Sequence, residues 1–330
     1  MAKYDVYGIG NALVDMEFEV NPEFLTKMEI DKGLMTLVDQ NRQGQLLESL
    51  TGIHHKRTCG GSAANTIIAV SQLGGQSFYS CKIANDETGD FYYKDLESNG
   101  VVTNLGDGSR PEGTTGKCMV FITPDADRTM NTYLGITETF SIENLVESEI
   151  SDSKYLYIEG YLVTSPTGKA AAIKAKEIAE KNGVKTSITF SDPGIVGHFK
   201  NQFDEIIGNG VDLLFCNEEE ALSYTGETDI KNAFEKLKSV AKSFAITQGP
   251  RGALIYDGEK EIDVLTNKVD AIDTNGAGDL FAGSYLYGIT NGHSVSESAK
   301  LACSASSKLV TQFGARLSKE QLLGIKKDLL

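Results

Sequence analysis

The chain has 330 residues, of which 40% are hydrophobic and 23% charged, a composition that excludes a disordered or fibrous protein. The net charge of −15 argues against binding to nucleic acid or to an anionic membrane, although backbone N–H groups can still build a local phosphate site. The five cysteines form no Cys-x-x-Cys pair, the N-terminus lacks a signal-peptide pattern and no apolar run approaches the ~18 residues of a membrane span, so we expect a cytoplasmic protein with reduced thiols.

Strand-like and helix-like segments alternate along most of the chain. Residues 4–10 predict a strand, 63–73 a helix that two glycines end, 77–83 a strand and 86–98 an amphipathic helix. Later predicted strands are 154–158, 184–190, 211–216 and 244–247, and the helices between them are 166–181, 218–224 and 230–240. Repeated strand–helix units predict an α/β fold with a mostly parallel sheet and helices on both faces.

Two stretches break this alternation and predict a small β-sheet. Residues 14–20 with 33–38, and 116–123 with 128–134, are strand-like and have no helix between them. The second pair meets at Pro124-Asp125-Ala126-Asp127, which has the composition of a turn. We therefore expect a β-lid made of 14–38 and 116–134, and a discontinuous large domain made of 1–13, 39–115 and 135–330.

The glycine-rich stretch 273–279 (DTNGAGD) precedes an apolar run that predicts a helix. Free N–H groups of Gly276, Ala277 and Gly278 at such a helix start would form an anion hole, and Asp279 could act as a base toward an attacking hydroxyl. The alternative is a glycine-rich turn with an acidic residue in the first helical turn. A Walker A loop is absent, and residues 8–13 (GIGNAL) lack the third glycine of a dinucleotide fingerprint.

Two further motifs suit the binding of a polyol. Gly60 and Gly61 would let a substrate lie against the backbone, and Asn65 offers both a donor and an acceptor to hydroxyls. Asp15, with Asn11 close by, follows the first predicted strand. The alternatives are a glycine-rich entry to a helix and an exposed carboxylate at a strand end.

Two motifs of the second half follow predicted strands. Asn217 and Glu220 begin a helix, where the alternative is an N-cap with acidic residues in the first turn. Thr247, Gly249 and Gly252 lie beyond the next strand, where the alternative is a plain turn.

Taken in chain order, the motifs resemble the signatures of the ribokinase-like (PfkB) carbohydrate and nucleoside kinases. Residues 273–279 match D-T-x-G-A-G-D in full, and 60–65 match G-G-x-x-x-N. The resemblance runs from residue 10 to residue 279. It implies a three-layer α/β/α fold with a mostly parallel central sheet and a small β-sheet lid, and an ATP-dependent phosphotransferase that acts on an alcohol group.

The resemblance also implies roles for individual residues. It implies that Asp279 is the catalytic base and that Gly276, Ala277 and Gly278 form the anion hole. The implied acceptor-binding residues are Asn11, Asp15, Gly60, Gly61 and Asn65; the implied ATP-binding residues are Asn217, Glu220, Thr247, Gly249 and Gly252. Glu220 would organise Mg²⁺ largely through water, because Mg²⁺ keeps much of its hydration shell. Asp273 and Ser318 match the outline of a monovalent-cation site for K⁺.

Within the family, residues 159–166 (EGYLVTSP) and the Asn of DTNGAGD are similar to those of adenosine kinases. That resemblance implies an arginine near the phosphates, a position that Arg128 fits. Candidate walls for a purine are Leu13, Met35, Leu134 and Tyr161. The expected partner is a small-molecule nucleoside or sugar, and the expected assembly is a monomer or a lid-mediated homodimer. A ribokinase- or fructokinase-type sugar kinase stays open as an alternative, and a non-catalytic binding protein with this fold is a distant one.

Overall fold

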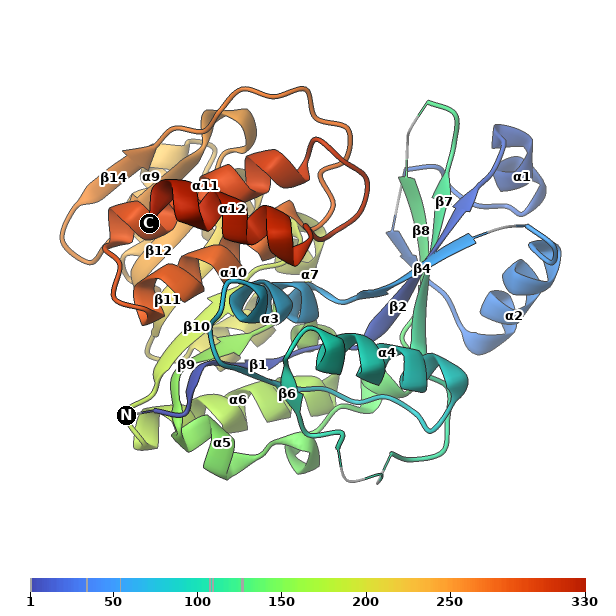
Figure 1. The fold of residues 1–330 in the computed structure, drawn as a ribbon, viewed down its shortest axis with the longest axis horizontal. Helices are drawn as coiled ribbons and strands as arrows, with labels where there is room; N and C mark the ends of the chain where they lie inside the picture. The colour runs from blue at the N-terminus through green and yellow to red at the C-terminus, as the bar shows by residue number, and fades with distance from the viewer. Residues whose placement is uncertain (1, 34, 54, 107, 109, 126–127) are drawn as a thin grey trace.

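The computed structural model describes residues 2–33, 35–53, 55–106, 108, 110–125 and 128–330. Within these residues the chain forms one large and one small β-sheet (Figure 1). The small sheet, with helices α1 (Pro22–Lys27) and α2 (Gln40–Ser49), stands at one side of a layered body that contains the large sheet (Figure 1).

The large sheet has nine strands among the described residues, in the order β14-β13-β12-β11-β10-β9-β1-β5-β6. It is parallel except at β13 and β14, which pair antiparallel at one edge. In chain order its strands are β1 (Tyr4–Ile9), β5 (Ser77–Ser80), β6 (Val102–Thr103), β9 (Ser153–Ile158), β10 (Lys185–Thr189), β11 (Val211–Asn217), β12 (Ala241–Thr247), β13 (Ala253–Tyr256) and β14 (Glu261–Val264). The predicted mostly parallel sheet is confirmed.

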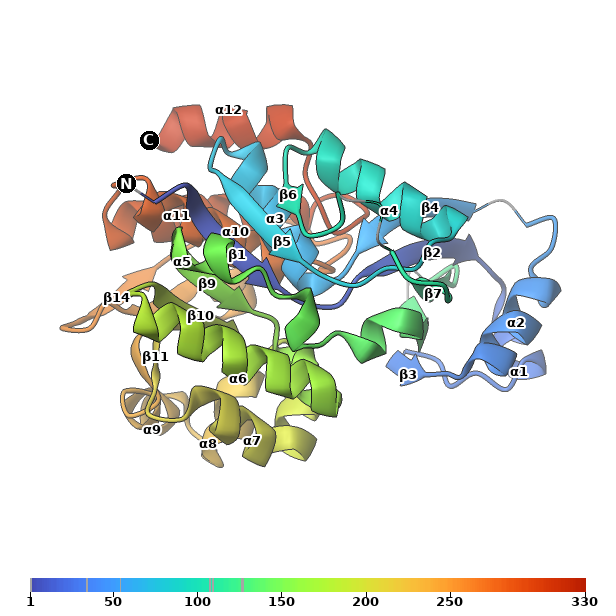
Figure 2. The same ribbon diagram turned by 90° about the horizontal axis from the view of Figure 1, so that it is seen from below.

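Helices cover both faces of the large sheet, which makes the body a three-layer α/β/α structure (Figure 2). One face carries α3 (Ser62–Gln72), α4 (Glu87–Ser98), α10 (Ala277–Thr290), α11 (Val295–Leu309) and α12 (Lys319–Leu329). The other carries α5 (Glu147–Ser151), α6 (Pro166–Lys181), α7 (Pro193–Ile207), α8 (Glu218–Thr225) and α9 (Ile230–Leu237). Since β-strands alternate their side chains, the buried strands feed one apolar cluster on each face, and this burial stabilises the body.

The small sheet has the order β3-β8-β7-β2-β4. Its strands are β2 (Leu13–Glu19), β3 (Met35–Leu37), β4 (His55–Gly60), β7 (Gly116–Ile122) and β8 (Arg128–Tyr133). Four of them lie in or at the edge of the segments predicted to form a lid. The fifth, β4, comes from residues that had been assigned to the large domain, and it pairs antiparallel with β2 from Leu13↔Gly60 to Phe18↔His55. Its sequence, HKRTCG, lacks the apolar alternation that marks a strand, so only the pairing with β2 reveals it. Residue 34 of the predicted strand 33–38 and residues 126–127 of the predicted turn lie outside the described part.

The two faces of the small sheet have different environments. Met16 and Phe18 of β2 belong to one hydrophobic cluster with Leu25 of α1 and Leu46 of α2. Asp15, one residue away, points to the opposite face because neighbouring residues of a strand alternate. This face bears the polar groups that meet the large domain.

The described cysteines are all buried and free, as expected from their spacing. Among the described residues, none of the helices has both the length and the apolar character that a membrane crossing requires.

Candidate active site

The carboxyl ends of β1 and β9 lie side by side where the strand order of the large sheet changes direction. Ligands bind at such switch points in open α/β sheets. Glu159, directly after β9, accepts hydrogen bonds from Asn11 N (3.3 Å) and Asn11 Nδ2 (3.1 Å) at Oε1, and from Ala63 N (2.9 Å) at Oε2. Glu159 is 1% exposed, and burial raises its pKa to about 7 although these N–H groups oppose the rise. The carboxylate thus joins two strand ends to the start of α3.

Asn11, a predicted acceptor-binding residue, is engaged in this framework. Its Oδ1 accepts a hydrogen bond from Thr137 Oγ1 (3.4 Å), and its carbonyl oxygen accepts one from the Tyr79 hydroxyl (3.0 Å). The Asn11 carbonyl also lies against Gly61, the N-cap of α3, which has φ 94° and no room for a Cβ. The glycine of the predicted motif therefore lets the β1 end touch the start of α3.

Asp279, the predicted base, lies in the first turn of α10 and faces the first turn of α3. Its Oδ1 accepts a hydrogen bond from Ser62 Oγ (2.6 Å), and its Oδ2 accepts one from Asn65 Nδ2 (3.0 Å). Thr66 Oγ1 donates to the Asp279 carbonyl (3.2 Å), and Gly283 lets the two helices approach because a Cβ there would collide with the Thr66 carbonyl. Burial raises the pKa of Asp279, and the hydrogen bonds from Ser62 and Asn65 partly offset the rise.

The glycine-rich loop brings an open helix N-terminus next to Asp279. Gly276 caps α10 with φ 73°, and a Cβ on it would collide with the Ala315 carbonyl. Ala277 N donates to Thr274 O (3.2 Å). Gly278 N has no hydrogen-bond partner among the described residues, and a Cβ on Gly278 would meet no atom within 4 Å. The space beside Gly278 is therefore open, as an approaching phosphate requires.

Arg128 links the small sheet to this loop. Its Nη2 lies 2.7 Å from Asp273 Oδ2, and its Nη1 lies 3.4 Å from Glu17 Oε1. Asp273 Oδ2 also accepts a hydrogen bond from Gly314 N (2.8 Å), and Asp273 Oδ1 accepts one from Asn275 N (3.0 Å). The ion pair therefore anchors the predicted lid against the first aspartate of DTNGAGD.

Asp15, a predicted acceptor-binding residue, lies on the same face of the small sheet as Arg128 and is partly exposed. Its carboxylate packs against Gly60, where a Cβ would collide with it. Burial raises the pKa of Asp15 to about 7, and the positive charge of Arg316 opposes this rise. Arg316 itself is held by Asp95 Oδ2 (2.8 Å) and by the Cys59 carbonyl (2.7 Å).

The predicted ATP-side motif at Asn217 forms a capping box. Asn217 N and Nδ2 donate to the two carboxylate oxygens of Glu220 (both 2.9 Å), and Glu220 N donates to Asn217 Oδ1 (2.8 Å). Burial raises the pKa of Glu220 to about 7. Both oxygens of Glu220 are thus engaged by Asn217, as the alternative of an N-cap with acidic residues in the first turn predicted. No described cluster of three or more His, Cys, Asp or Glu side chains could hold a metal directly.

The second ATP-side motif forms the turn from β12 to β13. Thr247 ends β12, and Gly249 and Gly252 have φ of 55° and 100°. A Cβ on Gly252 would collide with the Val264 carbonyl, so this turn needs glycine for its own geometry. The turn lies at the same carboxyl edge as Asn217, and the strands β11 and β10 separate β12 from β9, which leads to Glu159.

The predicted purine walls are only partly brought together. Leu13 and Leu134 both flank Gly116, where a Cβ would meet the Leu13 side chain and the Leu134 carbonyl. Tyr161 follows Glu159 in a 3₁₀ helix, and burial raises the pKa of its hydroxyl. Met35 lies on the edge strand β3, separated from β2 by two strands, and is 37% exposed.

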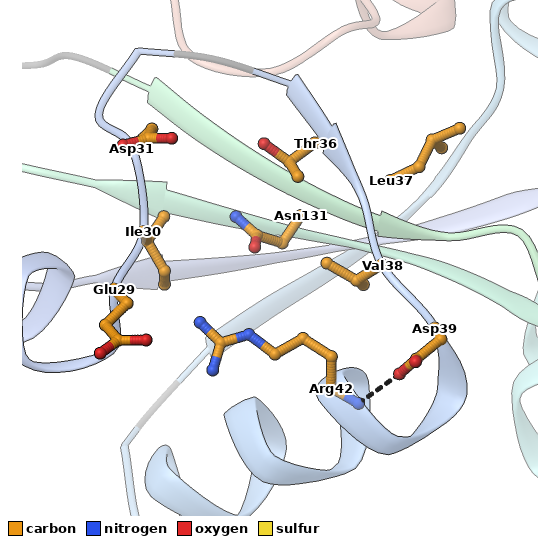
Figure 3. A pocket seen from close by; sticks show the side chains of 9 residues that line it. All are labelled: Glu29, Ile30, Asp31, Thr36, Leu37, Val38, Asp39, Arg42 and Asn131. Atoms are coloured by element: carbon orange, nitrogen blue, oxygen red, sulfur yellow. Dashed lines mark hydrogen bonds between the residues drawn. The ribbon is translucent and has the colours of Figure 1, made fainter.

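Two cavities of the described part are lined by other residues. A pocket of about 310 Å³ lies beside β3 and α2, with Asn131 and Arg42 among its lining residues (Figure 3). The register places Asn131 beside Met16 through Met119, so it lies on the sheet face opposite Asp15. A second, of about 480 Å³, lies at the amino ends of β10, β11 and β12. The candidate site is therefore defined by hydrogen bonds and loop geometry, and neither cavity contains a predicted site residue.

Three residues of the site were not predicted: Ser62, Glu159 and Arg316. Ser62 lies inside the quoted CGGSAAN, and its place one residue after the helix cap was an available signal. Glu159 lies in EGYLVTSP, where a glutamate directly after an apolar strand could have been recognised as a buried carboxylate. Arg316 carries no local signal.

Comparisons with known proteins show the family and the fold of this chain. A family model described as pfkB family carbohydrate kinase matches residues 36–322. The crystal structure of adenosine kinase from Sinorhizobium meliloti is 34% identical, with a TM-score of 0.90 over 99% of both chains. A probable sugar kinase protein from Rhizobium etli CFN 42 is 34% identical, with a TM-score of 0.89 over 99% of both chains. Adenosine kinase 2 of Arabidopsis thaliana is 28% identical over 339 residues, which cover 95% of this chain and 96% of the relative.

Proposed function

The chain belongs to the pfkB family of carbohydrate kinases and is a phosphotransferase with an alcohol group as acceptor; we propose that it phosphorylates the ribose hydroxymethyl oxygen of a nucleoside, and that adenosine is converted to AMP. The family resemblance and the fold class predicted from the sequence are thereby confirmed. The adenosine kinases among the relatives support a nucleoside acceptor.

The pairing of Asp279 with the open start of α10 carries the proposal. Asp279 is held by Ser62 and Asn65, and Gly278 N, one residue earlier, has no partner among the described residues. A base and an anion-binding N–H group are thus adjacent, which is the arrangement that phosphoryl transfer to a hydroxyl needs.

In the proposed reaction, Asp279 takes the proton from the acceptor hydroxyl as its oxygen attacks the γ-phosphorus. A positioned base of this kind contributes about 10²–10⁴-fold. Burial raises the pKa of Asp279 toward the range where a carboxylate accepts a proton more readily. The N–H groups around Gly276, Ala277 and Gly278 stabilise the charge on the transferred group. The bond from Ala277 N to Thr274 O makes this N–H less available than that of Gly278.

The acceptor ribose is proposed to bind between the two sheets. Asp15 accepts hydrogen bonds from two hydroxyls, and Asn65 offers Oδ1, which is buried and has no partner within the described ranges. Gly60 and Gly61 allow close approach of the sugar. Asn11, through its hydrogen bond to Glu159, holds the end of β1 in place beside this site.

The nucleotide is proposed to lie along the carboxyl edge of β11 and β12, next to Thr247, Gly249 and Gly252. Mg²⁺ that arrives with ATP would shield the phosphate charge. Asn217 and Glu220 would orient its water shell, since Glu220 is engaged in the capping box.

Segments 14–38 and 116–134, together with β4 and α2 that pack with them, are proposed to act as a lid over the acceptor, and the three-layer body forms the large domain. Leu13, Leu134 and Tyr161 would contact the purine, and Arg128 would neutralise phosphate charge at the lid edge. Closure would exclude water and limit ATP hydrolysis. Met35, exposed at the edge strand, would contact the base only after a lid movement.

The proposal extends to the cellular setting. We propose a cytoplasmic enzyme of purine salvage that works as a monomer or as a homodimer joined through its lids. The exposed Leu37 (53%) on edge strand β3 supports the dimer form, because an unpaired edge can add a second strand.

A radiolabelled-ATP assay with adenosine, inosine, ribose and fructose tests the acceptor. We expect adenosine to give the highest kcat/KM, because its linked ribose and purine contact both sheets. If ribose or fructose is the better substrate, the second candidate, a sugar kinase, replaces the first; the likeness to the probable sugar kinase of Rhizobium etli favours that candidate. A protein with no kinase rate on any polyol would instead be a binding protein with this fold.

A further inference from the structure

The guanidinium of Arg128 lies where the family resemblance implied a monovalent cation. Asp273 was expected to hold K⁺ together with Ser318. Instead Arg128 Nη2 is 2.7 Å from Asp273 Oδ2, and the two side chains are only 14% and 3% exposed. The expected carboxylate therefore already has a buried positive partner.

The remaining geometry also does not fit a K⁺ site. Both Asp273 oxygens accept backbone hydrogen bonds, from Gly314 N and Asn275 N. A K⁺ ion on this carboxylate would lie next to the guanidinium, and two like charges at short range repel strongly in a buried setting. Ser318 is exposed and caps α12, where its Oγ accepts a hydrogen bond from Gln321 N (3.3 Å).

Arg128 is held so that its charge stays at this place. Glu17 Oε1 lies 3.4 Å from Nη1, and the Phe313 ring centre lies 6.0 Å from the guanidinium carbon. Asp273 lies three residues before Gly276, so its charge would oppose an approaching phosphate if it were not neutralised.

We infer that Arg128 supplies the positive charge beside the glycine-rich loop that a monovalent cation would otherwise supply, so that this protein works without K⁺. The inference rests on the proposed phosphoryl transfer. It differs from a bound-ion site in one respect: the charge belongs to β8 of the predicted lid and reaches Asp273 only when the lid lies against the loop. The ion pair between Arg128 and Asp273 would then couple lid closure to the neutralisation of the Asp273 charge beside the anion hole.

The first experiment compares KCl with tetramethylammonium chloride at constant ionic strength, in the absence of Na⁺. For the unmodified protein we expect kcat with adenosine and ATP to agree within about twofold in the two salts. The melting temperature without substrates should also be the same in both. A rate that rises more than about threefold with K⁺ would overturn the inference.

The second experiment removes the resident charge. Arg128→Ala leaves Asp273 buried without its guanidinium, so the melting temperature should fall in tetramethylammonium chloride and recover in part with KCl. Arg128→Lys keeps the charge and should show no K⁺ effect. Arg128→Ala combined with Asp273→Asn removes both charges and should lose the K⁺ effect again.

Arg57→Ala is the matched control, since Arg57 is also an arginine of the small sheet and pairs with Glu87 (2.7 Å), away from Asp273. It should show no K⁺ dependence of melting. If Arg128→Ala shows no K⁺-specific stabilisation, or if Arg57→Ala shows the same one, Arg128 does not replace a cation. Because melting is measured without substrate, this result does not depend on the acceptor. A protein inactive on adenosine would refute the proposed function, and the effect of K⁺ on the melting temperature could still be interpreted.

Discussion

Asn65 Nδ2 donates a 3.0 Å hydrogen bond to Asp279 Oδ2, joining the first turns of two helices that are 214 residues apart in the sequence. The bond connects the two strongest motifs of the chain. Asn65 thereby contacts the proposed base with its donor while its Oδ1, buried and without a partner in the described part, stays available to an acceptor hydroxyl. One amide can thus position both reactants of the proton transfer.

Replacing Asp279 by Asn should remove the base and preserve the fold. The amide oxygen can still accept from Ser62 or Asn65, so the melting temperature should change little, whereas kcat should fall about 10²–10⁴-fold. Asp328→Asn, an exposed change at the end of α12, is the control and should leave kcat unchanged. Near-normal turnover of the Asp279 variant would exclude it as the base.

Gly278→Ala should distinguish an effect on the anion hole from an effect on the stability of the fold. A Cβ at Gly278 meets no protein atom within 4 Å, and alanine favours a helix over glycine by up to about 1 kcal/mol. The variant should therefore melt no lower than the parent, while the methyl group occupies the space proposed for phosphate and lowers kcat. Gly324→Ala in α12 also meets open space, so it should match the melting behaviour and keep full activity. Equal kcat in both variants would contradict the anion hole.

The sequence predicted the parts of this structure that local patterns encode. Among the described strands of the large sheet, β1, β5, β9, β10, β11 and β12 follow apolar runs that are readable in a single chain, as do helices α3 and α4, whereas β6, β13 and β14 were not predicted. The polar strand β4 was not predicted, because its place depends on pairing with β2. Helices α1 and α2 were missed for a related reason: they are short and are stabilised by packing on the small sheet.

The candidate site shows the same division. The glycine motifs and Asp279 can be identified from the sequence pattern alone. The structure then shows which groups they contact. No local signal shows that Arg128 pairs with Asp273, because that contact joins β8 to a loop far along the chain. Nor does the sequence show that Asn11 and Glu220 are already engaged, since both roles come from three-dimensional neighbours.

Asp15 should govern the affinity for the acceptor. Asp15→Ala removes a charged hydrogen-bond partner of two hydroxyls, which costs about 1.5–3 kcal/mol of binding. The KM for adenosine should therefore rise roughly ten- to a hundredfold, and the KM for ATP should stay close to that of the parent. A 2′- or 3′-deoxyadenosine series provides the check: the parent should discriminate against these analogues, and the variant should not. An unchanged KM for adenosine would remove Asp15 from the acceptor site.

The same residue predicts a pH dependence. Burial raises the pKa of Asp15 to about 7, so below that pH its carboxyl carries a proton and accepts fewer hydrogen bonds. The KM for adenosine should fall as the pH rises through about 7 and level off above it. In Asp15→Asn the side chain does not titrate, so this part of the profile should be flat. A parent whose acceptor KM is constant from pH 6 to about pH 8 would contradict the assignment.

Glu159 should make the stability of the fold depend on pH in a direction opposite to that of an ordinary salt-bridged carboxylate. Burial raises its folded-state pKa from 4.5 to about 7, so the unfolded chain loses this proton first as the pH rises. The contribution of Glu159 to the free energy of unfolding is fully present below about pH 4.5, decreases as the pH rises toward 7 and is absent above that. The free energy of unfolding changes over this range by at most about 1.4 kcal/mol per pH unit.

Glu159→Gln removes the titrating group, and its effect is measured by urea unfolding at several pH values between 4.5 and 8. Asp15 and Glu220, whose pKa values burial also raises, contribute in the same direction, so the informative quantity is the difference between parent and variant. At low pH the protonated Glu159 carboxyl and the glutamine amide each present one accepting and one donating end to Asn11 and Ala63, so parent and variant should have similar stability there. As the pH rises toward 7 only the parent loses stability from this group, so the difference in the free energy of unfolding should shift in favour of the variant. A gap that stays constant over the whole range would show that Glu159 keeps the same charge in the folded and unfolded chain, and that its role between β1, β9 and α3 is independent of protonation.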